Sequence, residues 1–142
     1  MNIKKLNPNA IVPTRGSDFA AGLDLYACLD ADLTVAPGEI TRIGTGFAIA
    51  CPAGYFAGIF ARSGLATKQG LRPTNCVGVV DSDYRGEVIV ALYNDSKETR
   101  VIKHGDRVAQ MILIPYAHTY LNVVDELSET DRGDGGFGST GK

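Results

Sequence analysis

The stretch that decides the fold is Tyr55-Phe56-Ala57-Gly58-Ile59-Phe60-Ala61-Arg62, in which residue character alternates at period two. Successive side chains of an extended strand point to opposite faces, so residues 55, 57, 59 and 61 share one face and residues 56, 58, 60 and 62 the other. Both faces carry large apolar side chains, which indicates a strand covered on both sides.

The same pattern continues on both sides of this stretch. Leu23 and Leu25 alternate with Asp24 and Tyr26, and apolar residues alternate with small ones over residues 46–51. Two short apolar runs, Val88–Tyr93 and Val108–Ile114 (interrupted by Gln110), are typical of buried strands. Turn-forming residues separate these segments, at Pro37-Gly38, Pro52-Ala53-Gly54, Tyr84-Arg85-Gly86, Asn94-Asp95 and His104-Gly105-Asp106.

Only residues 63–69 resemble a helix, with Ser63 expected as its N-cap and Gly70 just past its end. Eight or more short strands and one short helix predict an all-β fold, a sandwich or a jelly roll. We expect one domain over residues 1–130. Residues 131–142 hold five glycines and one large apolar side chain, so this tail should be flexible.

Composition narrows the function classes. The 142-residue chain has 14 basic and 16 acidic side chains, a net charge of −2, which argues against a general nucleic-acid binder. No apolar run approaches the ~20 residues of a membrane span, and no signal peptide is visible, so a soluble cytoplasmic protein is expected. Cys28, Cys51 and Cys76 form no Cys-x-x-Cys pair, so we expect three buried thiols rather than disulfides or a zinc site.

Three segments could carry chemistry. Residues 75–87 read as a strand, a tight turn and a return strand, with Asp81 and Asp83 on one face: either a carboxylate pair for general-base or metal chemistry, or an ordinary solvated hairpin. Residues 61–66 read as an anion site at a helix start, or as a plain N-cap with a surface arginine. The tail could wrap a phosphate or have no function, although an isolated Phe137 among glycines favours docking. Asp24 taken alone reads as an exposed strand residue.

Five segments in order resemble the five motifs of the trimeric deoxyuridine triphosphatases (dUTPases). They are residues 21–27 (AGLDLYA), 61–66 (ARSGLA), 75–87 (NCVGVVDSDYRGE), 105–110 (GDRVAQ) and 132–141 (RGDGGFGSTG). The resemblance implies a homotrimeric jelly roll with active sites shared between subunits. It also implies that water attacks the α-phosphorus of dUTP with Mg²⁺ present, giving dUMP, the precursor of dTMP, and pyrophosphate.

The resemblance also implies roles for individual residues. Asp81 would be the general base and hold the sugar 3′-hydroxyl, Tyr84 would pack under the deoxyribose, and Asp83 would be structural. Uracil would meet Asn75 and the backbone of Gly78, Val79 and Val80. The residues expected on the α- and β-phosphates are Arg62, Ser63, Gly64 and Gln110.

The remaining implied roles concern the metal and the tail. Asp24 would hold Mg²⁺ through a water molecule. Phe137 would stack on uracil, and Arg132, Gly138, Ser139 and Thr140 would close over the nucleotide, with the γ-phosphate as their main target. Two alternatives stay open: a dCTP deaminase-like enzyme on the same fold, although that family has Arg-Ser-Ser where this chain has Arg62-Ser63-Gly64, and a regulatory nucleotide-binding protein without activity.

Overall fold

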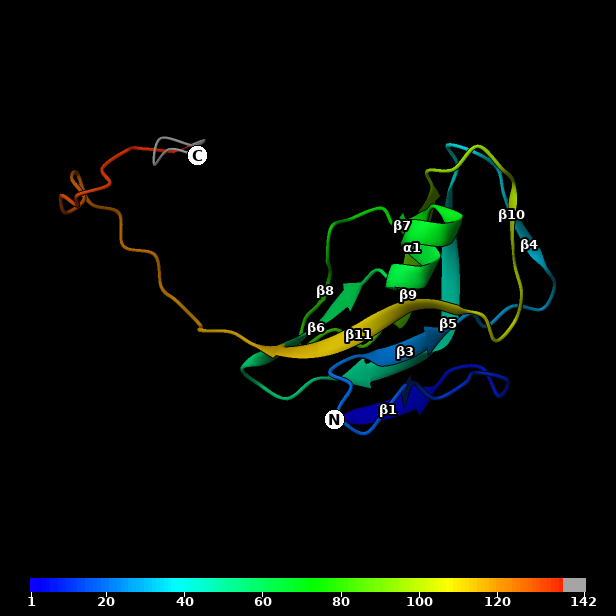
Figure 1. Ribbon diagram of the computed structural model, residues 1–142. Coiled ribbons are helices and arrows are strands. Elements are labelled where there is room, and N and C mark those ends of the chain that lie inside the picture. The colour runs from blue at the N-terminus through cyan, green and yellow to red at the C-terminus, as the bar shows by residue number, and fades with distance from the viewer. Residues whose placement is uncertain (137–142) are drawn as a thin grey trace.

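The computed structural model describes residues 1–136, which form eleven strands and one helix (Figure 1). The prediction of an all-β chain with eight or more strands and one short helix is therefore confirmed. The elements are β1 (Asn2–Lys5), β2 (Thr14–Arg15), β3 (Leu23–Tyr26), β4 (Leu33–Val35), β5 (Ile40–Ala50), β6 (Tyr55–Phe60), α1 (Ser63–Gln69), β7 (Leu71–Pro73), β8 (Gly78–Val80), β9 (Glu87–Asn94), β10 (Arg100–Ile102) and β11 (Arg107–Pro115).

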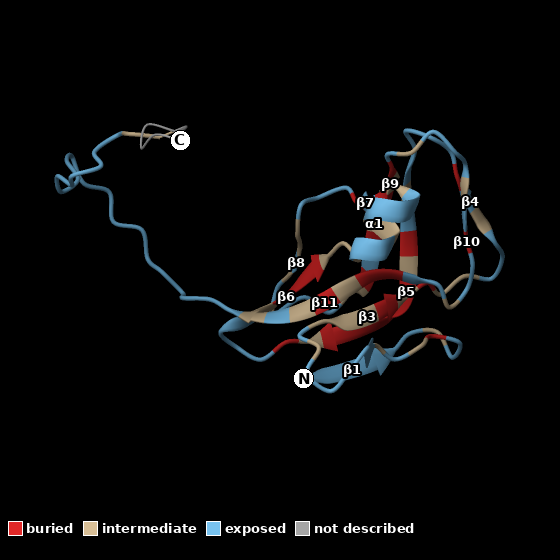
Figure 2. Cartoon of the chain, viewed as in Figure 1, coloured by how far each residue is buried: buried red, intermediate tan, exposed pale blue. Residues whose placement is uncertain are grey.

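The strands make two main antiparallel sheets and one small one. The four-stranded sheet has the order β1-β5-β9-β7, and the five-stranded sheet has the order β2-β3-β11-β6-β8. Strands β10 and β4 form a two-stranded sheet of their own. Phe47 and Val90 from the first sheet share one buried cluster with Leu25 and Met111 from the second, so the sheets enclose a single core of the jelly-roll type (Figure 2).

The stretch over residues 55–60 is covered on both faces, although unequally. Ala57 and Ile59 point into the core and are 0% and 4% exposed. On the opposite face Phe56 and Phe60 are half-buried, and a Cβ added to Gly58 would lie 2.7 Å from the Phe60 ring. The period-two pattern therefore predicted both the strand and its two-sided packing.

The predicted hairpin over residues 75–87 is wrong. Strand β8 pairs with β6, whereas β9 pairs with β5 and β7 in the other sheet. Residues 81–86 therefore cross from one sheet to the other. Alternation shows that a segment is a strand but does not identify its partner, which is chosen by long-range packing.

Helix α1 spans the predicted residues, and Gly70 ends it in the left-handed conformation at φ 68°. Its N-cap, however, is Arg62 rather than Ser63, and no side chain caps it. The backbone of Arg62 keeps the extended conformation that leads out of β6, at φ −87° and ψ 128°. Ser63 is consequently the first helical residue.

The cysteines differ in burial. Cys51 is buried, Cys28 is half-buried and Cys76 is exposed in the connection between β7 and β8, so the expectation of three buried thiols is wrong for two of them. All three are free thiols, and burial raises the pKa of Cys28 and Cys51. Within residues 1–136 no helix has the length and apolar character of a membrane span.

The chain leaves the sandwich after β11. Residues 116–136 contain neither strand nor helix, and Figure 1 shows this orange-to-red segment leading away from the sheets. Several of its apolar side chains are almost fully exposed: Tyr120, Leu121, Val123 and Leu127 range from 87% to 96%.

Candidate active site

A pocket of about 290 Å³ lies at the connection between the two sheets, beside residues 81–86. It combines residues of β8 with the β9 strand of the opposite sheet. Six of the residues predicted to bind nucleotide line it: Asn75, Gly78, Val79, Val80, Asp81 and Tyr84. Arg42 and Glu87 also line this pocket, and the motif reading had given neither of them a role.

Backbone and side-chain hydrogen bonds close the turn that carries Asp81. The Tyr84 N–H donates to the Asp81 carbonyl at 3.2 Å, and the Tyr84 hydroxyl donates to the Glu87 carbonyl at 3.1 Å. A Cβ added to Gly86 would overlap that hydroxyl, so glycine is required for the tyrosine to fold back. The Asp81 carboxylate is exposed and has no hydrogen-bond partner among residues 1–136. It is therefore available to a ligand.

The opposite rim of this pocket is the edge of a sheet. Among the described residues, strand β8 is last in its sheet and pairs only with β6, so one side of its backbone offers N–H and C=O groups without a strand partner. A Cβ added to Gly78 would lie 3.1 Å from the Ile59 Cβ and 3.3 Å from the Asn75 Nδ2. Asn75 therefore sits against the β8 backbone, and together they form a polar edge.

A second pocket of about 360 Å³ surrounds Asp24, between β3, β11 and the start of α1. The Arg62 Nε donates to one carboxylate oxygen of Asp24 at 2.7 Å, and an Arg107 terminal nitrogen donates to the other at 3.2 Å. Asp24 is only 14% exposed, so it is not the simple exposed residue that its strand position suggested. Two guanidinium groups and one carboxylate leave this pocket with a net positive charge.

Gln110 completes the second pocket. It lies opposite Asp24 in the β3–β11 pairing, and its Nε2 donates to the Ala61 carbonyl at 2.8 Å. A Cβ at Gly22 would lie 2.7 Å from the Gln110 Oε1, so glycine makes room for this amide. The predicted phosphate residues Arg62, Ser63, Gly64 and Gln110 all line this pocket.

Arg107 is the residue that the sequence reasoning missed here. The signal was present in Gly105-Asp106-Arg107-Val108-Ala109-Gln110, because Arg107 precedes Gln110 on the same strand. Its proximity to Asp24, 83 residues away, becomes visible only with the β3–β11 register.

The other predicted site residues lie elsewhere. Arg132 is exposed, lines neither pocket, and donates from its Nε to the Gly135 carbonyl at 2.8 Å. Asp83 is exposed in the turn and also lines neither pocket. Phe137, Gly138, Ser139 and Thr140 lie outside the described residues.

The two pockets are far apart within one chain. Three strand spacings separate β3 from β8, and the registers place Asp81 about four residues along the strands from the level of Asp24. With strands ~4.8 Å apart and ~3.4 Å per residue, the backbones of the two residues are about 20 Å apart along the sheet. One nucleotide cannot place its reacting phosphate against both.

The second pocket can bind a metal ion through a water molecule but does not offer a set of direct protein ligands. Within residues 1–136 no three acidic, histidine or cysteine side chains cluster to ligate a metal, and Asp24 is the only acidic residue lining this pocket. Each Asp24 oxygen already accepts one hydrogen bond from an arginine but has a second lone pair. Asp24 can therefore hold a water molecule of a hydrated Mg²⁺ ion.

Comparison with known proteins gives concordant matches. A family model described as dUTPase matches residues 8–141. The deoxyuridine 5′-triphosphate nucleotidohydrolase of Desulfitobacterium hafniense is 53% identical over 131 residues, covering 92% of this chain and 87% of that protein.

Solved structures agree with this family match. A mutant dUTPase of Staphylococcus bacteriophage 80alpha with dUpNHpp has a TM-score of 0.86 at 27% identity, covering 99% of this chain and 98% of the other. A mutant dUTPase of phage phi11 of S. aureus, which coordinates a structural Mg(II) ion, has a TM-score of 0.82 at 23% identity over 90% and 98% of the two chains. At that identity it shows a shared fold alone.

Proposed function

The chain belongs to the dUTPase family, and from this premise we propose that it hydrolyses dUTP to dUMP and pyrophosphate in the cytoplasm. The observation that carries the proposal is the pocket beside Asp81. It combines an unpaired carboxylate, an aromatic ring fixed by its own hydroxyl and the polar edge of a strand. These three features match a nucleophilic water, a deoxyribose and a uracil base.

Uracil would be read by the backbone of residues 78–80 together with Asn75. Strand-edge donors and acceptors are fixed in direction, so they pair with the alternating carbonyl and N–H groups of uracil. Cytosine carries an amine where uracil has a carbonyl, and each buried group left unpaired would cost ~1–3 kcal/mol. The methyl group of thymine would collide with a close-fitting β8 edge.

The sugar and the reacting water would lie at Asp81 and Tyr84. The Tyr84 ring is anchored through its hydroxyl to the Glu87 carbonyl, so it can support the deoxyribose and leave no room for a 2′-hydroxyl. Asp81 would accept a proton from water while the water oxygen bonds to the α-phosphorus. The bond from the α-phosphorus to the bridging oxygen then breaks, and pyrophosphate leaves with the electron pair.

The phosphates would bind in the second pocket, where Arg62 and Arg107 supply positive charge beside Ser63, Gly64 and Gln110. A protein with a net charge of −2 needs such local charge to attract a triphosphate. Mg²⁺ carried by the nucleotide would add further positive charge and keep most of its waters, one of which Asp24 would hold. Arg132 and residues 137–140 would close over the nucleotide as a lid.

A homotrimer would bring these parts together. Because Asp81 and Asp24 are about 20 Å apart in one chain, the phosphate pocket of one subunit must face the Asp81 pocket of another to hold one nucleotide. The exposed apolar side chains of residues 120–127 also need a cover, which a neighbouring subunit would provide. Light scattering should give the mass of three chains, and a monomer at micromolar concentration would contradict this assembly.

The test of the function is pyrophosphate release from dUTP, dCTP, dTTP and UTP, with and without Mg²⁺. We expect release from dUTP only, with a strong requirement for Mg²⁺. Asp81→Asn should retain dUpNHpp binding while turnover falls about 10²–10⁴-fold, the range for loss of a general base. Asp83→Asn is the matched control, because Asp83 is exposed two residues away and lines neither pocket.

Three results would contradict the proposed residue role or the proposed activity. Near-wild-type turnover by Asp81→Asn would remove Asp81 as the base, and ammonia release from dCTP would indicate a deaminase instead. Binding of dUpNHpp without hydrolysis of dUTP by the wild-type protein would indicate a regulatory binding protein.

A further inference from the structure

Helix α1 cannot hold its own position. It has seven residues, none of them buried, although Leu65 packs against the core, and helices of this length are unstable without tertiary contacts. Yet the chain at its start carries Arg62, Ser63 and Gly64, which the proposed function places on the phosphates. The positions of these three residues in the second pocket therefore depend on the contacts that hold α1 in place.

The C-terminal end of α1 is attached to the loop of residues 94–100. The Gln69 carbonyl accepts a hydrogen bond from the Arg100 Nε at 2.9 Å, and the Gly70 carbonyl accepts one from the Asp95 N–H at 2.8 Å. A Cβ at Gly70 would lie 2.9 Å from the Ser96 backbone nitrogen. The helix end is thus pressed directly onto this loop.

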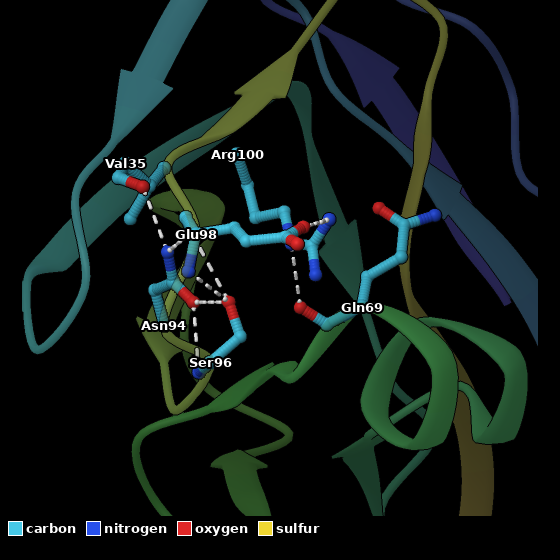
Figure 3. A network of polar contacts seen from close by, with 6 residues as sticks. All are labelled: Val35, Gln69, Asn94, Ser96, Glu98 and Arg100. Atoms are coloured by element: carbon cyan, nitrogen blue, oxygen red, sulfur yellow. Dashed lines mark hydrogen bonds and ion pairs between the residues drawn. The ribbon is translucent and has the colours of Figure 1, made fainter.

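The loop is itself rigid because Asn94 fixes it from within (Figure 3). Asn94 is 0% exposed, and its amide nitrogen donates to the carbonyls of Val35 and Glu98, both at 2.8 Å. Its amide oxygen accepts from the Ser96 N–H at 3.0 Å and from the Ser96 hydroxyl at 2.7 Å. Every hydrogen-bonding group of this buried side chain is used.

Arg100 connects this rigid loop to the helix. One of its terminal nitrogens pairs with a Glu98 carboxylate oxygen at 2.9 Å, which orients the guanidinium while its Nε holds Gln69. Figure 3 shows the Arg100 side chain between Glu98 and Gln69. The Arg100 side chain is 24% exposed and lines neither candidate pocket, so it does not reach a ligand bound in either of them.

We propose that Arg100 is a positioning residue for the phosphate end of the site, acting through α1. The start of the helix is pinned by Gln110 on the Ala61 carbonyl and by Asp24 on Arg62. Arg100 holds the other end through its hydrogen bond to the Gln69 carbonyl. Helix α1 is then a rigid element that keeps Ser63 and Gly64 in position beside the second pocket. This inference rests on the proposed function, because it requires that residues 62–64 bind phosphate.

The experiment compares ligands with and without phosphates. In Arg100→Met, we expect the Kd for dUpNHpp, measured by calorimetry, and the KM for dUTP to rise about three- to tenfold, the range for losing one hydrogen bond. Inhibition by deoxyuridine, which carries no phosphate, should change less than twofold. Lys103→Met is the control, since Lys103 is a more exposed cation just beyond β10 that pairs with Asp32 at 3.6 Å and lines neither pocket, and it should change neither value.

Arg100→Lys keeps the charge but cannot bind Gln69 and Glu98 with one planar group, so it should weaken dUpNHpp binding by about two- to threefold. If Arg100→Met does not fold, the dUpNHpp affinity of Arg100→Lys tests the inference on its own. Unchanged dUpNHpp affinity, or equal weakening of deoxyuridine and dUpNHpp, would overturn the inference. A wild-type protein that neither binds dUpNHpp nor hydrolyses dUTP would instead overturn the proposed function.

Discussion

Replacing Asn94 by Asp should destabilise the protein strongly, and more so at neutral than at acidic pH. The substitution keeps the shape and the oxygen that accepts from Ser96, but it replaces the amide nitrogen by a second oxygen. The carbonyls of Val35 and Glu98 then lose the hydrogen bonds from this nitrogen and face a carboxylate, while the Ser96 hydroxyl stays 3.1 Å from the Glu98 carbonyl oxygen. The position is fully buried, so water cannot replace the lost hydrogen bonds.

The magnitude follows from those two contacts. Losing a hydrogen bond to a buried carbonyl costs ~1–3 kcal/mol, which gives about 2–6 kcal/mol for the two lost contacts. An unfolding entropy of ~2.1 cal/mol/K per residue gives ~0.3 kcal/mol/K for this chain, so Tm should fall by about 7–20 °C at pH 7.

The stability of Asn94→Asp should also depend on pH, which gives a second test of the buried carboxyl group. Burial beside two carbonyls should raise the pKa of the introduced carboxyl above its usual value near 3.9. The folded state then binds this proton more tightly than the unfolded state does. The variant therefore keeps more of its stability at low pH and loses it as pH rises above about 4 through the raised pKa. The protonated group can also donate one hydrogen bond and recover part of the lost contact.

The assay is thermal unfolding of both proteins between pH 4 and pH 8 at one fixed chain concentration. The difference in Tm between wild type and variant should widen as the pH increases. Asp95→Asn is the control: its side chain is 60% exposed, and exposed substitutions change stability by less than ~0.5 kcal/mol. A Tm loss below about 3 °C at pH 7, or a loss independent of pH, would refute this account of Asn94.

Two further predictions concern the phosphate end and the tail. Gly22→Ala should push Gln110 off the Ala61 carbonyl and lower kcat/KM for dUTP about tenfold. Thr34→Ala, at an exposed position of β4 that lines neither pocket, should have no effect in the same kinetic assay. Deleting residues 132–142 should remove most dUTPase activity yet leave Tm within a few degrees, because within residues 1–136 the Arg132 side chain hydrogen-bonds only to its own turn. Full activity, or loss of the trimer on gel filtration, would contradict the lid role of the tail.

Local patterns in the sequence predicted the elements well. The alternation over residues 55–60 produced β6, and the glycines of the proposed turns at 38, 54 and 105 adopt positive φ, as the turns require. Gly70 ends α1 where expected, also with positive φ. These features depend on residues close in sequence, so one sequence is sufficient to identify them.

Features that depend on long-range pairing could not be predicted in this way. The strands on either side of Asp81 look like a hairpin locally, but each finds its partners in a different sheet. Asn94 reads as an ordinary turn residue, yet the loop folds over it and buries it completely. The partners of Asp24 lie 38 and 83 residues away, so its two ion pairs follow only from strand register.

The separation of the two pockets has a chemical advantage for the proposed reaction. A general base must keep a free lone pair, whereas a triphosphate site needs guanidinium groups nearby. Asp24 shows what happens when a carboxylate and guanidinium groups lie on one surface. Each of its oxygens pairs with an arginine, at 2.7 Å and 3.2 Å. Asp81 lies about 20 Å from Arg62 and Arg107 within its own chain, and although Arg42 lines its pocket, its carboxylate forms no ion pair within residues 1–136. If the facing pockets belong to different subunits, the nucleotide itself separates the base from the arginines. The carboxylate can then remain unpaired until the phosphate that it serves is in place.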